Sequence, residues 1–182
     1  MKMFSIRAAV QTDAYGIAQV HVGSWRTTYA GILPDTYLAG LDQSLRTRLW
    51  QEWLAGPTAI FVAEQDGLVV GFAHAGPNRE PTESCDAELY ALYLLKDAQG
   101  IGIGTALLRA TATELVGRNF KGMAVWVLEQ NRSRMFYERT GAYLTSTKVI
   151  EIGGVKLMEV SYAWPDLTKL TGPSQVIPNP HS

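Results

Sequence analysis

A buried strand, a glycine-rich loop and a helix follow one another over residues 86–116, and this succession constrains the fold most. Residues 86–95 are apolar at nearly every position, which is typical of a strand covered on both faces of a sheet. Such a strand needs helices on each side, so the sequence predicts a mixed α/β domain. Hydrophobic periodicity and turn residues add further predicted helices over 13–28, from Pro34, and over 45–54, 104–116 and 133–139, and a buried strand over 123–128.

Two hairpins are predicted from their turn residues. Asp66-Gly67 separates apolar runs at 60–64 and 68–75, and Gly153-Gly154 separates runs at 143–150 and 155–164. Both pairs suit the positive φ angles of tight hairpin turns. We expect one domain over residues 1–164, followed by a loosely attached, proline-containing tail over 165–182.

Composition excludes several classes of protein. The 16 Lys and Arg residues nearly balance 17 Asp and Glu residues, for a net charge of -1, so a dedicated nucleic-acid binder is not expected. The lone Cys85 excludes an internal disulfide, and the three histidines have no metal-ligand spacing, so we expect no metal site. No apolar run is long enough to span a membrane and the N-terminus does not resemble a signal peptide, so a soluble, cytoplasmic protein is expected.

The loop Gln99-Gly100-Ile101-Gly102-Ile103-Gly104-Thr105 carries the strongest functional signal. Alternate glycines let a ligand approach the backbone, and the helix N-terminus that follows favours a phosphate or pyrophosphate. A Walker loop is excluded because no lysine follows Gly104. A dinucleotide fingerprint is a distant second, since its glycine spacing differs, and a simple strand-to-helix turn without a ligand is the structural alternative.

Two segments resemble a known family. Gln99, Gly102 and Gly104 after Glu88-Leu89-Tyr90-Ala91-Leu92-Tyr93-Leu94 resemble the acyl-CoA-binding segment of the GCN5-related N-acetyltransferases (GNAT). The segment from Asn131 through Phe136-Tyr137 to Gly141-Ala142-Tyr143 resembles that family's second segment. The resemblance spans nearly the whole chain, and residues 21–34 resemble the corresponding segment of a bacterial subgroup of unassigned acceptor. It implies a mostly antiparallel, twisted sheet that is splayed between its fourth and fifth strands and flanked by helices.

The resemblance also implies how acetyl-CoA, the acyl donor, is bound. The pyrophosphate would lie on the amides of Gln99, Gly100, Ile101, Gly102, Ile103, Gly104 and Thr105, so a branched side chain at Gly104 should obstruct it. The pantetheine arm would pair with Leu92, Tyr93 and Leu94, and Asn131 and Tyr137 would contact the cofactor. Lys96, Arg132 and Arg134 are equally suited to the 3′-phosphate and to ordinary solvated surface.

Tyr137 and Glu88 are the candidate catalytic residues. A phenol can protonate the departing thiolate, although Tyr137 would also pack well between helix and sheet. Glu88 matches a position where family members carry a carboxylate that acts through water, with Asp86 as a substitute and a solvent-facing glutamate as the alternative. Strict strand alternation places Glu88, Tyr90, Leu92 and Leu94 on one face.

The acceptor is expected beside the first helix. Trp25 and Tyr29 share a helix face and could form an apolar wall, with Arg26 near an anionic group of the substrate, or could simply pack on the sheet. His21 lies on the same face and is expected to be structural. A small-molecule amine or a peptide N-terminus is the expected partner, and neither nucleic acid nor a membrane is.

The sequence thus predicts an acetyl-CoA-dependent N-acetyltransferase that acts by direct attack of a primary amine in a ternary complex. The alternatives are a non-catalytic acyl-CoA sensor on the same fold and a nucleotide-binding α/β domain. Transfer to oxygen stays open, and Cys85 is expected to be incidental. A homodimer through the second hairpin is possible by analogy with the family.

Overall fold

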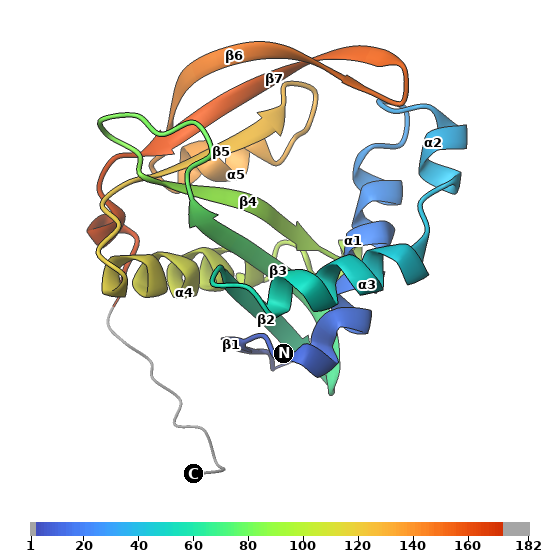
Figure 1. Ribbon diagram of the computed structural model, residues 1–182, viewed down its shortest axis with the longest axis horizontal. Coiled ribbons are helices and arrows are strands. Elements are labelled where there is room, and N and C mark those ends of the chain that lie inside the picture. The colour runs from blue at the N-terminus through green and yellow to red at the C-terminus, as the bar shows by residue number, and fades with distance from the viewer. Residues whose placement is uncertain (1–2, 173–182) are drawn as a thin grey trace.

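The computed structural model describes residues 3–172 and shows a single twisted sheet with helices on both faces (Figure 1). Every predicted helix and strand is present, and the mixed α/β class is confirmed. In chain order the elements are β1 (Ser5–Ala8), α1 (Ala14–Thr28), α2 (Asp35–Ala39), α3 (Gln43–Leu54), β2 (Ala59–Gln65), β3 (Leu68–Pro77), β4 (Ala87–Leu94), α4 (Ile103–Gly117), β5 (Met123–Leu128), α5 (Arg134–Arg139), β6 (Tyr143–Ile152) and β7 (Val155–Trp164).

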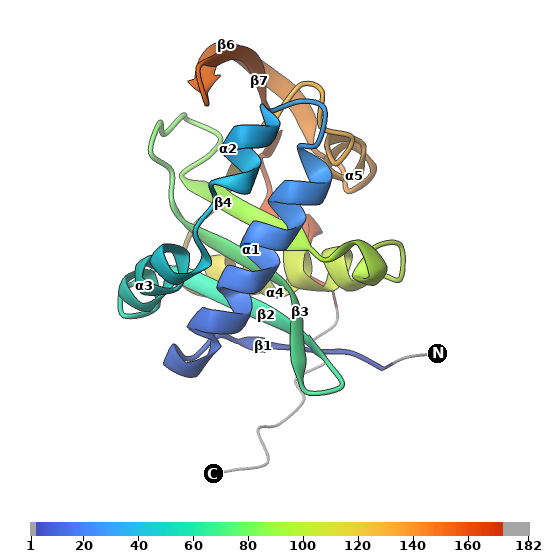
Figure 2. The same cartoon turned by 90° about the vertical axis from the view of Figure 1, so that its right-hand side faces the viewer.

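The strands lie in the order β1-β2-β3-β4-β5-β7-β6, and every neighbouring pair is antiparallel except β4 and β5. Helices α1 and α3 cover one face of β2, β3 and β4, where Trp50, Phe72 and Ile17 are fully buried (Figure 2). Helix α4 covers the opposite face and buries Leu107, Leu108 and Leu115 in the larger core. The sheet therefore has two separate apolar layers, as a strand buried on both faces requires.

Both hairpins turn where the sequence predicts. Asp66 and Gly67 have φ angles of 53° and 77°, and Gly153 and Gly154 have φ angles of 60° and 79°. Two consecutive positive φ angles define the tight turn whose twist matches the flanking strands. The second hairpin reaches α2, because Gly153 packs directly against the Tyr37 ring.

An aspartate precedes both α1 and α3. The Asp13 carboxylate accepts from the preceding Val10 amide (2.8 Å) and from Arg7 instead of the first turn of α1. Asp42 accepts from the Ser44 and Leu45 amides at the start of α3. Asp42 is therefore an ordinary side-chain N-cap, whereas Asp13 fixes the segment before its helix.

The divergence of β4 from β5 opens the centre of the sheet. Only Ala87 with Met123 and Glu88 with Ala124 are paired between the two strands. From Leu89 onward, the edge of β4 that faces β5 has no strand partner. The splay between the fourth and fifth strands, which the family resemblance implied, is confirmed.

A β-bulge accompanies this divergence. On β3, His74 and Ala75 are adjacent, but their partners on β4 are Ala91 and Leu89, so Tyr90 is an extra residue. An extra residue shifts the alternation of side chains by one position. The expectation that Glu88, Tyr90, Leu92 and Leu94 share a face is therefore wrong.

The bulge changes which side chains of β4 lie on each face of the sheet. Leu92 and Leu94 pack in the core beneath α4, whereas Ala91 and Tyr93 pack in the layer under α1 and α3. Tyr90 joins the second group, since its ring lies 5.0 Å from that of His74. Glu88, opposite Gly76, is on this side as well.

The segment after β7 is partly integrated into the core. Leu167 is fully buried in the layer under α4, and Leu170 packs beside it. The Leu167 amide donates to the Lys121 carbonyl at 2.8 Å. Residues 165–170 are thus not the loose tail that the prolines suggested, because a short 3₁₀ turn directs one leucine inward. The remainder of that predicted tail, residues 173–182, lies outside the described residues.

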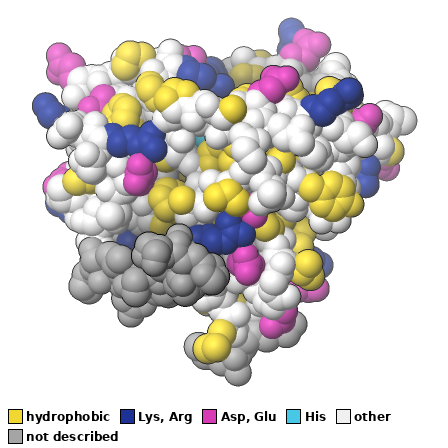
Figure 3. Space-filling view, turned by 60° about the horizontal axis from the view of Figure 1, so that its bottom comes forward, with side chains coloured by type: hydrophobic (Ala, Val, Ile, Leu, Met, Phe, Trp, Pro, Cys, Tyr) yellow, Lys and Arg dark blue, Asp and Glu magenta, His cyan; other side chains and the backbone are white. Residues whose placement is uncertain are grey.

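Charges of both signs are interspersed with apolar side chains on the face shown in Figure 3. Within residues 3–172, none of the helices has the length and apolarity needed to cross a membrane.

Candidate functional site

The glycine loop forms a cradle of backbone amides at the start of α4. Gly100 and Gly102 have φ angles of 77° and 92°, and a Cβ added to either would meet no atom within 4 Å. The amides of residues 100–105 donate to no acceptor among the described residues. Unpaired amides at a helix N-terminus attract an anion, so the loop suits a phosphate or pyrophosphate.

Gly104 has another role than expected. A Cβ at this position would meet Leu94 at 3.4 Å and Phe136 at 3.5 Å, which are ordinary packing distances. Its side faces the contact between α4, β4 and α5, not the open cradle. A side chain at Gly104 would therefore first meet Leu94 and Phe136, whereas one at Gly102 would enter open space. Ile101 is exposed and Ile103 is fully buried, so Ile103 offers only its amide to a ligand.

The loop is tied to the open edge of β4. Gln99 Nε2 donates to the Leu94 carbonyl at 3.3 Å, which connects the first loop residue with the last residue of the strand. The unpaired edge from Leu92 to Leu94 thus runs directly toward the cradle. An extended chain laid along this edge can reach the loop, as the pairing of a pantetheine arm requires.

Three tyrosines from distant segments converge beside the splay. The Tyr29 and Tyr93 hydroxyls lie 3.4 Å apart. Asn131 and Tyr137 are close enough to Tyr29 to act on its pKa, and Tyr93 raises the pKa of Tyr137. Burial raises the pKa of each of the three phenols. The three hydroxyls therefore stay protonated at neutral pH. The structure brings together Tyr29, Tyr93, Asn131 and Tyr137, four of the predicted site residues.

Tyr137 combines packing with a free hydroxyl. Its ring meets the Trp164 ring edge-on at 5.7 Å, and only 5% of the residue is exposed. Its hydroxyl forms no hydrogen bond with any described residue. The Asn131 carboxamide is fixed, since its Oδ1 accepts from the Ser133 amide at 2.9 Å. Packing holds the Tyr137 ring while leaving its proton available.

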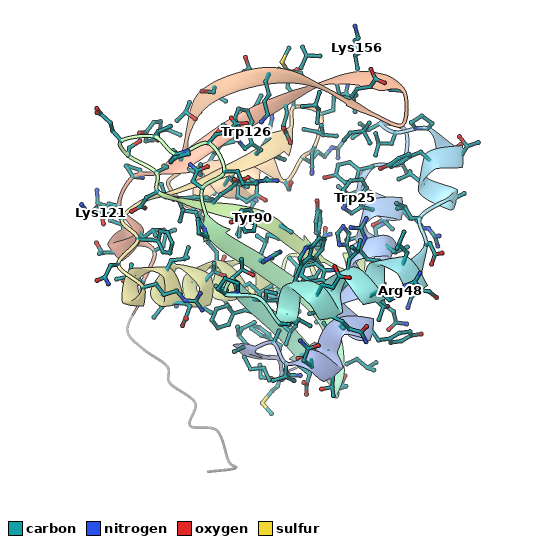
Figure 4. All side chains as sticks on the ribbon, in the orientation of Figure 1. Trp25, Arg48, Tyr90, Lys121, Trp126 and Lys156 are labelled. Atoms are coloured by element: carbon teal, nitrogen blue, oxygen red, sulfur yellow. The ribbon has the colours of Figure 1, made fainter. Side chains whose placement is uncertain are left out.

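Trp25 and Arg26 have different surroundings, although they are adjacent in sequence. The Trp25 ring lies 4.8 Å from that of Tyr29. Its buried Nε1 lies near the Tyr93 hydroxyl and lowers the pKa of that phenol, although the two groups do not form a hydrogen bond of ordinary geometry. Figure 4 shows Trp25 of α1, Tyr90 of β4 and Trp126 of β5 in the central region of the molecule. Arg26 instead donates to the carbonyls of Leu38 and Leu41 at the end of α2, so its guanidinium stabilises that turn.

Glu88 is buried in an ion pair. Its carboxylate accepts from the Arg79 amide at 3.1 Å, from Arg79 Nε at 3.0 Å and from Arg79 Nη2, and only 2% of it is exposed. The Arg79 guanidinium also lies 5.2 Å from the Tyr90 ring. Arg79 therefore occupies both oxygens of this carboxylate. Asp86 accepts from the Lys121 and Gly122 amides and fastens the start of β5.

Glu159 on β7 is a carboxylate that sequence reasoning missed. It lies between Leu128 and Lys148 of the neighbouring strands and is 19% exposed. Its nearest cation is Lys148 Nζ at 3.9 Å, and no described residue donates a hydrogen bond to it. Burial raises its pKa, and Glu88 and Glu80 raise it further, against Lys148 and Arg79. A single acid between Met158 and Val160 was the only sequence signal, and its proximity to Tyr93 follows only from the strand order.

A profile of the acetyltransferase (GNAT) family matches residues 25–142, which include the cradle, the splay and the tyrosine cluster. The chain belongs to the GNAT family. The resemblance stated for the two sequence segments is therefore confirmed, and the interpretation as a dinucleotide-binding domain is wrong. Within residues 3–172 of this GNAT protein, no group of three or more His, Cys, Asp or Glu residues is arranged to hold a metal ion.

Individual relatives agree with this membership. The chain is 43% identical over 169 residues to YuaI of Bacillus subtilis, named an uncharacterized N-acetyltransferase, covering 92% of this chain and 96% of YuaI. The PaiA N-acetyltransferase of Thermoplasma acidophilum, solved with coenzyme A, superimposes with a TM-score of 0.65 at 21% identity, covering 89% of this chain and 99% of PaiA. YncA of Salmonella typhimurium, solved with its cofactor acetyl-CoA, gives a TM-score of 0.68 at 20% identity over 90% of this chain and 94% of YncA.

The cradle of this acetyltransferase can be tested with a matched pair of glycines. We expect Gly102→Ala to weaken coenzyme A binding by about tenfold or more, because its methyl group would occupy the open space above unpaired amides. Gly67→Ala, at a similarly positive φ in the β2–β3 turn, should cost about the same 1 kcal/mol of folding stability and leave affinity unchanged. Calorimetric titration with coenzyme A measures both. Equal affinities in the two variants would contradict this use of the loop.

Proposed function

We propose that this protein transfers the acetyl group of acetyl-CoA to a primary amine by direct attack within a ternary complex. Family membership supports acetyl transfer, and the free amide cradle beside an unpaired strand edge supports coenzyme A as the carrier. The bond from the amine nitrogen to the acetyl carbon forms, the carbon–sulfur bond breaks, and the amine proton must leave as the sulfur gains one. The site therefore needs a proton donor and, for an ammonium substrate, a proton acceptor.

Acetyl-CoA would supply the activated thioester. The amides of residues 100–105 would hold its pyrophosphate, and the edge of β4 from Leu92 to Leu94 would align the pantetheine arm. Asn131 lies beside the tyrosine cluster, at the place where the reacting end would arrive. Lys96 and Arg132 are exposed and Arg134 is half-buried, and no contact selects one of them for the 3′-phosphate.

Tyr137 is the proposed proton donor for the leaving thiolate. Burial keeps its hydroxyl protonated, and no hydrogen bond within the described residues occupies that proton. Tyr29 and Tyr93 are less suited to this role because their hydroxyls are paired with each other. The free hydroxyl of Tyr137 is the observation on which this assignment rests.

Tyr137→Phe should lower kcat by about 100-fold or more, the usual effect of removing a general acid, with acetyl-CoA affinity nearly unchanged. The phenylalanine ring keeps the contact with Trp164, so the fold should persist. Thiol release from acetyl-CoA across a panel of amines measures kcat. A kcat equal to that of the wild type would exclude Tyr137 as the donor. An acyl-CoA sensor, the alternative function, would bind acetyl-CoA without turnover on any amine.

Two carboxylates compete as the proton acceptor. Glu88 is the position that the family resemblance indicates, but its oxygens are occupied by Arg79. Glu159 has a raised pKa and accepts no hydrogen bond from a described residue, and its charge acts on Tyr93. These contacts favour Glu159 as the base, with Glu88 holding Arg79 in place.

The pH dependence of kcat/KM separates the two carboxylates. A base must be ionised, so activity falls as the pH drops through its pKa, and the raised pKa of Glu159 puts this fall above the range of an ordinary glutamate. Glu159→Gln should lower kcat/KM by about 100-fold and remove this acidic limb. Glu88→Gln should keep the limb and lower thermal stability. The reverse outcome would make Glu88 the base, and an unchanged limb in both variants would leave water as the proton acceptor.

We further propose a cytoplasmic enzyme that forms a homodimer through β6. This strand is an edge of the sheet, and it exposes Tyr143, Leu144 and Val149. Unpaired edges with exposed apolar side chains favour pairing with another strand. Sedimentation equilibrium should give a dimer that Val149→Lys converts to a monomer. A wild-type monomer at micromolar concentration would contradict it.

A further inference from the structure

A cavity of about 450 Å³ lies on the face of β4 that carries the bulge, between this strand, β3 and α3. Its volume is within the range of small-molecule sites. Tyr90 and Ala91 of the bulge form part of its wall, so the cavity adjoins the position where β4 leaves β5. The glycine cradle and the part of the strand edge from Leu92 to Leu94 do not contribute to it. A ligand part other than coenzyme A can therefore occupy this space.

Aromatic rings form a continuous wall around the cavity. The rings of Trp50 and Trp53 meet edge-on at 4.8 Å, and the His74 ring lies 5.8 Å from Trp53. His74 in turn meets the Tyr90 ring edge-on at 5.0 Å. Such edge-to-face arrangements leave both ring faces and ring edges toward the open pocket. A planar ring fits against them better than a flexible chain does.

The two imidazoles on the cavity wall are uncharged. Burial lowers the pKa of His21 to about 3 and that of His74 to about 4, so both imidazoles are neutral at pH 7. The positive charges of Arg46 and Arg79 contribute to these shifts. Arg79, whose guanidinium is held by Glu88, and Glu52 also line the cavity, one charge of each sign. Burial, the largest cause of both shifts, disfavours a charged group beside the two rings and favours an uncharged one.

One hydrogen-bond donor is also available on the wall. Trp50 Nε1 can only donate, and it lies 3.3 Å from His21 Nδ1. The neutral His21 ring therefore carries its proton on Nε2, which has no acceptor among the described residues. The cavity thus combines aromatic walls with one weak polar anchor, as in a site for an uncharged aromatic group.

We propose that this cavity binds an aromatic ring of the acceptor, so that the substrate is a primary amine joined to an aromatic ring by a short linker. The inference rests on the proposed acetyl transfer and narrows its acceptor. Ala91 at the cavity and Tyr93 at the tyrosine cluster are about 7 Å apart along the strand, at about 3.3 Å per residue. A linker of a few atoms can therefore place the ring in the cavity and the amine beside Tyr93 and Glu159. Long polyamines and multiply charged sugars fit this arrangement poorly.

Binding of matched amines tests the cavity directly. In the presence of coenzyme A, calorimetry should show 2-phenylethylamine binding about fivefold tighter than 2-cyclohexylethylamine, the gain expected from aromatic contacts, and far tighter than spermidine. Trp53→Leu should reduce the difference between the two ring amines to less than about twofold. Tyr15→Leu, which removes an exposed aromatic side chain elsewhere on α1, should keep it. If Trp53→Leu fails to fold, the comparison of amines on the wild type still decides.

The outcomes separate this inference from the proposed function. Equal binding of the two ring amines, or tighter binding of spermidine, would overturn the aromatic cavity even if acetyl transfer occurs. Aromatic preference in binding without any thiol release from acetyl-CoA would support the cavity and contradict the catalytic proposal. A Trp53→Leu variant that changes preference between acetyl-CoA and butyryl-CoA but not between amines would assign the cavity to the acyl chain and overturn the inference.

Discussion

The early separation of β4 from β5 is the constraint on which the rest of this structure depends. Parallel pairing stops after Glu88 and Ala124, and the two strands then diverge around space that neither fills. Backbone groups left without a partner inside a protein are costly, so the open edge of β4 favours a partner from outside the chain. The glycine cradle at the end of that edge also has unpaired amides, and these favour a bound anion. The binding site follows from what the sheet leaves unpaired more than from any single side chain.

Side chains around the opening are supplied by segments far apart in sequence. Tyr29 comes from the end of α1, Tyr93 from β4 and Tyr137 from α5, and each is held by packing on a different layer. Burial keeps their phenols protonated while Glu159 is favoured toward the neutral form. Protonated phenols beside a carboxylate of raised pKa provide both proton donors and a proton acceptor in one buried site, as proton transfer requires. Glu88 does not belong to this group of proton donors and acceptors, because it is paired with Arg79.

Local signals in the sequence predicted much of the fold. The Asp66-Gly67 and Gly153-Gly154 turns, the buried strand at 86–95 and the helix after Gly102 all depend on neighbouring residues only. The bulge at Tyr90 could not be predicted in this way, because it depends on the register with β3. Glu159 was missed for a similar reason, since only the order of β5, β7 and β6 brings it near the centre. Gly104 and Gly102 look alike in the sequence, yet only Gly104 lies in the contact between α4, β4 and α5.

The segment after β7 shows the same limit at smaller scale. Its prolines suggested a loose tail, yet one turn of 3₁₀ helix buries Leu167. The Leu167 amide donates to the Lys121 carbonyl, which is distant in sequence. A partner from another segment thus decided a structure that the local sequence did not indicate.

The extra residue in β4 also reverses the alternation of side chains along the strand. Up to Leu89, even-numbered positions face α1 and α3, whereas beyond the bulge odd-numbered positions do. Deleting Tyr90 would restore regular alternation and leave both halves of β4 on their present faces, because Glu88, Ala91 and Tyr93 would then simply alternate with Leu89, Leu92 and Leu94. The extra residue thus lets two neighbouring side chains, those of Tyr90 and Ala91, face α1 and α3 together, which a regular strand does not allow. It adds one ring to that face without reversing any other side chain, so the length of the segment from Ala87 to Leu94 is itself part of the candidate site.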